Sequence, residues 1–90
     1  RRLDLAEGFF ESGDFASCMA EAAKIIALDA SEPEGWILRA RAHLALNERD
    51  AAVGAYERAL DCPLGPDRRK VVLEALDALE AYRPIDDYAE

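Results

Sequence analysis

The fold is decided by the stretch from Glu34 to Asp61, EGWILRARAHLALNERDAAVGAYERALD. Its apolar residues recur at spacings of three and four positions, and helix-forming residues dominate it, which is typical of amphipathic helices. Asn47 lies in the middle of the stretch and is a residue type that accepts the left-handed conformation at the end of a helix. The stretch therefore predicts two helices joined by a short turn.

Turn-forming residues divide the rest of the chain in the same manner. Glycine, asparagine and proline separate segments that are rich in helix-forming residues, and β-branched residues are few. We therefore predict an all-α protein of about five helices. Their approximate ranges are 3–11, 15–28, 32–46, 48–61 and 66–83, followed by a tail over 84–90.

Particular residues are expected to form the helix ends. Gly13 can adopt the left-handed conformation that ends a helix, and Asp14 offers a side-chain oxygen that caps the next one. Ser31 and Glu34 have the spacing of a capping box, and Pro33 is tolerated in a first helical turn. These signals predict short connections between the helices.

The composition indicates a small domain with a strong negative charge. The chain has 90 residues, of which 51% are hydrophobic and 33% are charged, and its formal net charge is −8. This charge disfavours binding to nucleic acids and to anionic membranes, and it is compatible with basic or apolar protein partners. The sequence contains no apolar run of the ~20 residues that span a bilayer.

The cysteine content favours a reducing compartment. Cys18 and Cys62 form no CxxC motif, and a disulfide-stabilised domain of this size would carry more cysteines. We therefore expect two free thiols and a cytoplasmic location. Because the chain begins Arg1-Arg2 and its single methionine is Met19, we also expect it to be a segment of a longer protein.

The sequence repeats itself with a period of 34 residues. Positions of similar size and polarity coincide after this shift. The pairs are Leu3 with Ile37, Ala6 with Ala40, Phe10 with Leu44, Gly13 with Asn47, Cys18 with Ala52, Met19 with Val53, Lys24 with Arg58 and Ile26 with Leu60. A period of this length that covers two helices is typical of helical repeat arrays.

The two units resemble the tetratricopeptide repeat family. In the first unit, Ala6, Phe10 and the turn sequence GDF lead to LDASEPEGW, which is similar to the junction between such repeats. In the second unit, Trp36, Ala40 and Ala52 lie where the family places one large and two small packing residues. The segment AYERAL is similar to the family's second-helix segment.

This resemblance covers about residues 3–64 and implies antiparallel helix hairpins stacked as a short right-handed superhelical solenoid. We expect a single domain, with a first repeat over 1–33, a second over 34–65 and a capping helix over 66–83. A cap is needed because the last helix pair of a stacked array would otherwise expose its apolar face. The apolar stripe expected on the capping helix consists of Val71, Val72, Ala75, Leu76, Leu79 and Tyr82.

The single tryptophan and the single histidine are interpreted as packing residues. Trp36 matches the family's large wedge, and His43 replaces a tyrosine of the family pattern. One histidine and two distant cysteines do not supply the three or four ligands that zinc needs. Cys18 falls at a small packing position, which disfavours a Cys–His nucleophile pair. We therefore expect no catalytic, cofactor-binding or metal-binding residue and no enzymatic activity.

The candidate binding surface is formed by the first helix of each unit. In the tetratricopeptide repeat family these helices line a concave groove that binds extended peptides or partner helices. The matching positions are Leu3, Glu7, Phe10, Glu11, Ile37, Leu38, Arg41, Leu44 and Ala45. Phe10 and Leu44 are equally compatible with a place in the core between helices.

The resemblance implies a non-catalytic module that binds a basic or apolar peptide, or a partner helix, of unknown identity. No nucleic acid and no membrane is expected as a partner. Two alternatives stay open. The chain can be a structural or self-associating segment of a longer solenoid, or an accessory domain of an enzyme whose catalytic domain lies elsewhere.

Removal of residues 66–90 tests the capping helix. We expect the shortened chain to unfold or aggregate, because the apolar face that the helix covers would be exposed to water. Circular dichroism and light scattering measure this. A soluble 1–65 fragment that melts cooperatively would show that this helix is not the cap.

Overall fold

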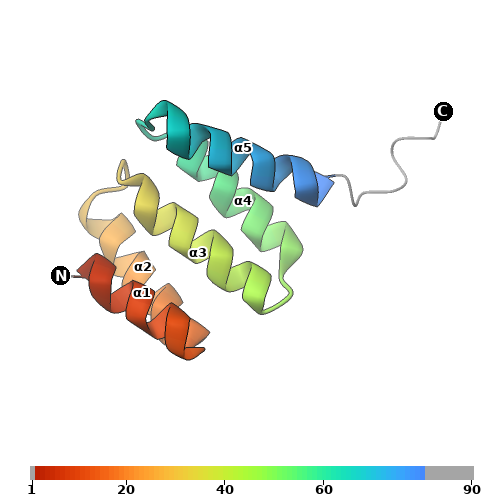
Figure 1. Ribbon diagram of the computed structural model, residues 1–90. Helices are drawn as coiled ribbons and strands as arrows, with labels where there is room; N and C mark the ends of the chain where they lie inside the picture. The colour runs from red at the N-terminus through yellow and green to blue at the C-terminus, as the bar shows by residue number, and fades with distance from the viewer. Residues whose placement is uncertain (1, 81–90) are drawn as a thin grey trace.

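The computed structural model describes residues 2–80, and this part of the chain is all-helical (Figure 1). The helices are α1 (Arg2–Ser12), α2 (Phe15–Leu28), α3 (Pro33–Ala45), α4 (Arg49–Leu60) and α5 (Pro66–Glu80). The prediction of an all-α protein is confirmed for these residues, with helix boundaries within two residues of those expected. The predicted end of the fifth helix and the tail over 84–90 lie outside the described residues.

Two connections contain the left-handed residues that the sequence predicts. Gly13 has φ 87° after α1, and Asn47 has φ 65° between α3 and α4. The Asp14 carboxylate accepts a hydrogen bond from the backbone N–H of Ser17 at 3.2 Å, which caps α2. The end of α1, the start of α2 and the turn between α3 and α4 therefore form as the sequence indicates.

The capping box expected at the start of α3 is wrong. Ser31 donates both its backbone N–H and its hydroxyl to the Asp29 carboxylate, at 3.0 and 2.6 Å. Glu32 is the N-cap residue instead, and its carboxylate accepts the N–H of Glu34 at 3.3 Å. The serine hydroxyl is used within the preceding turn, where its bond to Asp29 holds the pKa of that carboxyl below its ordinary value.

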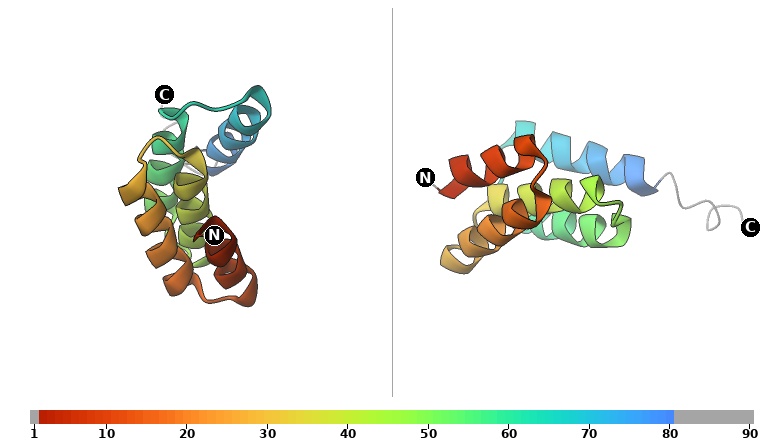
Figure 2. Two further views of the ribbon diagram at one scale, coloured as in Figure 1. Left: turned by 90° about the vertical axis from the view of Figure 1, so that its left-hand side faces the viewer. Right: turned by 90° about the horizontal axis from the view of Figure 1, so that it is seen from below.

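Each helix packs against the next one along the chain, and α1 also contacts α3. Both views of Figure 2 show α1 and α5 on one side of α3, with α2 and α4 on the other side. Two polar contacts help to attach α5 to the earlier helices. The Arg68 guanidinium pairs with the Glu34 carboxylate at 2.9 Å, and Arg49 donates a hydrogen bond to the carbonyl oxygen of Leu79.

The buried side chains form two clusters that share α3. The first core cluster consists of Ala6, Cys18, Ala22, Ile25, Leu38 and Ala42. The second core cluster consists of Ala40, Ala55, Tyr56, Ala59, Val72 and Leu76. Many of these residues are small, which lets the helix axes approach closely.

The apolar stripe of α5 is narrower than expected. Val72 is fully buried in the second core cluster, Leu76 is nearly so, and Ala75 and Leu79 pack against it. Val71 is 59% exposed, so its assignment to the stripe is wrong. Neighbouring helical residues are rotated by about 100°, which turns Val71 away from the face that Val72 buries. Tyr82 lies outside the described residues.

Two glycine substitutions should change stability in opposite directions. Gly13→Ala should lower the free energy of unfolding by about 1 kcal/mol, because an alanine at positive φ is strained. Gly54→Ala should raise it by about 0.5–1 kcal/mol, because this exposed glycine lies inside α4 and an added Cβ meets nothing within 4 Å. Urea unfolding followed by circular dichroism measures both. Equal effects of the two substitutions would contradict the assigned backbone conformations.

Candidate partner-binding pocket

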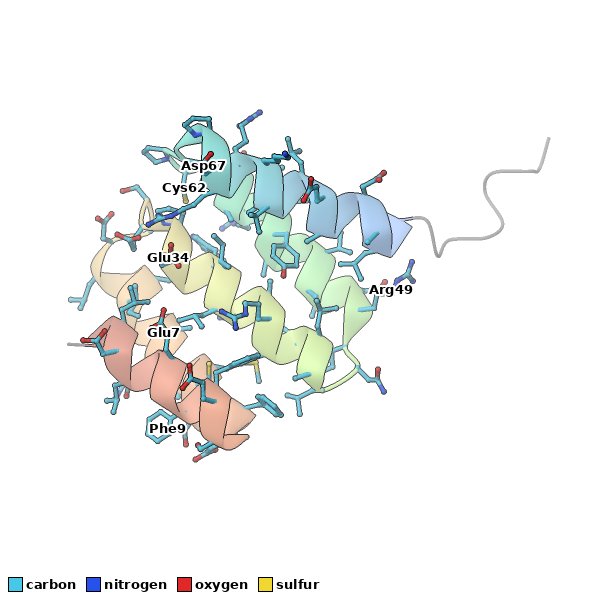
Figure 3. All side chains as sticks on the ribbon, in the orientation of Figure 1. Glu7, Phe9, Glu34, Arg49, Cys62 and Asp67 are labelled. Carbon is cyan, nitrogen blue, oxygen red and sulfur yellow. The ribbon has the colours of Figure 1, made fainter. Side chains whose placement is uncertain are left out.

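A pocket of about 190 Å³ lies between α1 and α3. Its lining residues are Glu7, Phe10, Glu11, Leu38 and Arg41. Figure 3 shows Glu7 on the edge of α1 that is nearer α3, whereas Phe9 lies on the opposite edge. The pocket, called the α1–α3 pocket below, therefore brings together five of the residues that the sequence places on a binding surface.

The other predicted surface residues lie outside this pocket. Leu3 is partly buried against the first core cluster, and Ile37 and Leu44 are partly buried against the second. Ala45 is exposed at the last residue of α3. Leu38 lines the pocket but is only 1% exposed, so it forms the floor rather than a contact surface. The predicted surface is thus divided between a polar pocket, the core and one exposed residue at the end of α3.

Phe10 belongs both to the core and to the α1–α3 pocket. Its ring packs against the first core cluster and meets the Phe15 ring edge to face, with 5.4 Å between the centroids. The Arg41 guanidinium lies over the same ring at 4.4 Å from its centroid. A cation above an aromatic face is stabilised by about 0.5–1 kcal/mol at an exposed site. Phe10 therefore holds the Arg41 head group in place at the pocket.

The charges of the α1–α3 pocket can contact a ligand. Glu7 is half-buried, and Glu11 and Arg41 are exposed. Within residues 2–80, neither carboxylate has an ion-pair partner, and Arg41 contacts the Phe10 ring rather than a carboxylate. The pocket thus offers two carboxylates to a basic group, beside one cation held over an aromatic ring.

Trp36 lies outside the α1–α3 pocket and packs against the second core cluster. Its indole N–H donates a hydrogen bond to the Ala30 carbonyl oxygen at 3.0 Å, and the Arg58 guanidinium lies 5.1 Å from the ring centroid. These contacts agree with the predicted wedge. They also fix the connection between α2 and α3 against the end of α4.

His43 connects the end of α3 to the residue that precedes α4. Its side chain is 14% exposed, and Nδ1 lies 2.7 Å from Oε1 of Glu48. Because a carboxylate only accepts hydrogen bonds, Nδ1 carries the proton in this contact. The sequence places His43 between helices but gives no indication of Glu48. The five-residue separation across the Asn47 turn is the signal that could have identified this pair.

The two cysteines are buried free thiols in separate surroundings, as the sequence predicts. Cys18 belongs to the first core cluster, whereas the Cys62 sulfur contacts the carbonyl oxygens of Ala30 and Arg58. Burial raises the pKa of both thiols, and the charge of Asp61 raises that of Cys62 further. Among residues 2–80, no cluster of three histidine, cysteine or acidic side chains could hold a metal ion.

None of the helices within residues 2–80 combines the length and the apolar character that crossing a bilayer requires. The longest, α5, has 15 residues and carries charges along its length.

No protein-family model matches this chain, and no curated protein matches it in sequence.

The stability of the protein should fall at alkaline pH because Cys18 is buried. The unfolded thiol ionises near its ordinary pKa of 9.0, whereas burial raises the pKa in the folded state. Stability is therefore unaffected below this pH and decreases as the pH rises from 9 through the higher folded pKa. Urea unfolding at several pH values should give a shallower decrease for Cys18→Ala than for the wild type. An identical pH dependence would show that the Cys18 thiol ionises equally well in both states.

Proposed function

We propose that this chain is a non-catalytic protein-interaction module of the tetratricopeptide type. In this proposal, α1–α2 and α3–α4 are antiparallel helix hairpins that stack as a short right-handed solenoid, and α5 caps the array. The α1–α3 pocket then belongs to a concave groove that takes a peptide or a partner helix.

The burial pattern supports the repeat architecture. Buried residues recur at the 34-residue period that the sequence suggests. The buried hydrophobic pairs are Ala6 with Ala40, Cys18 with Ala52, Ala22 with Tyr56, Ile25 with Ala59, Leu38 with Val72 and Ala42 with Leu76. The left-handed residues Gly13 and Asn47 are separated by the same interval. Equivalent positions in α1–α2, α3–α4 and α5 therefore have equivalent packing roles.

The observation that carries the binding proposal is the composition of the α1–α3 pocket. Glu7 and Glu11 project one helical turn apart from α1, and an arginine or lysine of a partner can bridge both carboxylates. The partly exposed Phe10 ring gives an adjacent apolar contact. A partner segment with a basic residue next to an apolar one fits this arrangement. Arg41 beside the acids disfavours partners with a cluster of several cations.

The pocket is small, so the affinity should be modest. A dissociation constant in the micromolar range corresponds to about 8 kcal/mol of binding free energy. Opposite charges at the rim affect mainly the association rate and its salt dependence. Binding should therefore weaken as ionic strength rises.

Chemical-shift mapping tests this function. The ¹⁵N-labelled chain is titrated with a short peptide that contains an arginine next to a leucine, and with a control peptide that replaces the arginine by glutamate. We expect saturable shifts in α1 and α3 with the first peptide and none with the second. Shifts confined to α2 and α4 would rule out the α1–α3 pocket as the binding site.

Two charge-reversal variants, one inside the α1–α3 pocket and one outside it, separate local binding from the effect of net charge. Glu11→Lys should weaken binding of the arginine peptide by about 3–10-fold, because one of the two carboxylates is replaced by a repelling cation. Glu57→Lys changes the net charge equally on the exposed surface of α4 and should leave the affinity within about twofold. Equal losses in the two variants would indicate attraction by net charge alone.

A further inference from the structure

Helix α5 lies at one end of the helix array (Figure 1). A second hollow, of about 450 Å³, is lined by residues of this helix. Its lining residues are Pro66, Arg69, Lys70, Leu73, Glu74 and Asp77. Leu73 is one of these lining residues and is 45% exposed. Val72 and Leu76 point into the second core cluster, so this surface is not used to hold α5 in place. It is called the outer α5 face below.

The charges of the outer α5 face are ordered along the helix. Arg69 and Lys70 come before Leu73, and Glu74 and Asp77 follow it. Arg69 lies four residues before Leu73 and Asp77 four residues after it. Residues four apart lie on the same side of a helix, so Arg69, Leu73 and Asp77 form one line. The line runs from a cation through an apolar residue to a carboxylate.

This order is complementary to itself when two copies run in opposite directions. A two-fold axis at Leu73 places the two leucine side chains together and sets Arg69 of each copy opposite Asp77 of the other. In a two-fold interface every such contact occurs twice. A parallel arrangement would instead place cation against cation and carboxylate against carboxylate, which is unfavourable.

We propose that the outer α5 face binds a second copy of this chain, with the two α5 helices antiparallel about an axis at Leu73. The interface consists of one apolar contact and two pairs of opposite charges. Helix α5 has 15 residues and is about 22 Å long. One face of such a helix buries less than the about 1,200 Å² of a standard interface, so the dimer is weak and dissociates at micromolar concentration.

The dimer leaves the α1–α3 pocket open. That pocket is lined by α1 and α3, and none of its residues belongs to the outer α5 face. A dimer therefore carries two such pockets. A partner with two binding segments can then bind both copies, which raises its apparent affinity without a new contact.

Sedimentation velocity on the complete 90-residue chain tests the association. The weight-average mass should rise towards that of a dimer between micromolar and millimolar concentration, and added salt should lower it, because charge pairs at a small interface are screened. A chain that stays monomeric at millimolar concentration overturns the proposal and leaves the face to another occupant, either residues 81–90 or a different protein.

Two substitutions on α5 locate the contact. Leu73→Glu should abolish the dimer, because it places two carboxylates at the two-fold axis. Val71→Glu introduces the same side chain at another exposed apolar position of the same helix and should leave the dimer intact. Loss of the dimer in both variants, or in neither, contradicts the assignment to the outer α5 face. Circular dichroism verifies that both variants stay folded.

Charge reversal tests the antiparallel direction. Arg69→Asp alone should be monomeric, because the new carboxylate would face Asp77 of the other copy. Asp77→Arg alone should also be monomeric, because the new guanidinium would face Arg69. An equimolar mixture of the two variants should form a heterodimer, because the Arg69→Asp carboxylate of one copy then faces the Asp77→Arg guanidinium of the other. The other pair in the mixture joins the unchanged Arg69 of one copy to the unchanged Asp77 of the other.

The mixture therefore restores two pairs of opposite charge, and its sedimentation should return to that of the wild type. A mixture of the two variants would be complementary in a parallel pair as well, so the single variants decide the direction. Single variants that dimerise as well as the wild type, or a mixture that stays monomeric while the wild type dimerises, overturn the antiparallel arrangement. Misfolding of either variant cannot produce this restoration.

Discussion

The rest of the structure depends on the burial of α3 on two sides. Leu38 and Ala42 belong to the first core cluster, and Ala40 belongs to the second. Ala40 and Ala42 are small, which lets helices approach α3 closely on both sides, and Leu38 fills the space in the first core cluster. At Gly35, α3 lies close to the side chains of α2. A Cβ there would lie 3.0 Å from Cγ2 of Ile25, so a side chain at this position would require the Ile25 side chain to move.

The double burial of α3 also determines where a partner can bind. The core occupies Leu38, Ala40 and Ala42, and the first helical turn lies against α2. Arg41 is then the charged position of α3 that faces the α1–α3 pocket. Because α1 contacts both α2 and α3, Glu7 and Glu11 are held beside this arginine. The polar pocket is thus a consequence of the packing that fills the two cores.

The sequence predicts the features that depend on neighbouring residues. The left-handed turns follow from Gly13 and Asn47, and the Asp14 cap follows from its place directly before α2. The Ser31 capping box is wrong because Asp29, two residues earlier, competes for the same hydroxyl. Capping patterns describe one acceptor and one donor, and they do not include a second acceptor in the preceding turn.

The candidate site is predicted only in part, because helical periodicity does not show how deeply Phe10, Leu38 and Arg41 are buried. That depth depends on the distance between α1 and α3, which is set by side chains elsewhere, and spacing along the chain does not determine it.

Apart from Asp67 in its first turn, the charges of α5 oppose the preference of an isolated helix. A helix favours carboxylates near its amino end and cations near its carboxyl end, by about 0.3–1 kcal/mol for each charge. Helix α5 instead has Arg68 and Arg69 near its start, Asp77 in its last turn and no basic residue there. The cost of Arg68 is offset by its ion pair with Glu34. For Arg69 and Asp77, the antiparallel dimer provides the opposing charges and also aligns the two helix dipoles in opposite directions. The positions of Arg69 and Asp77, which destabilise an isolated α5, therefore stabilise the antiparallel pair of α5 helices.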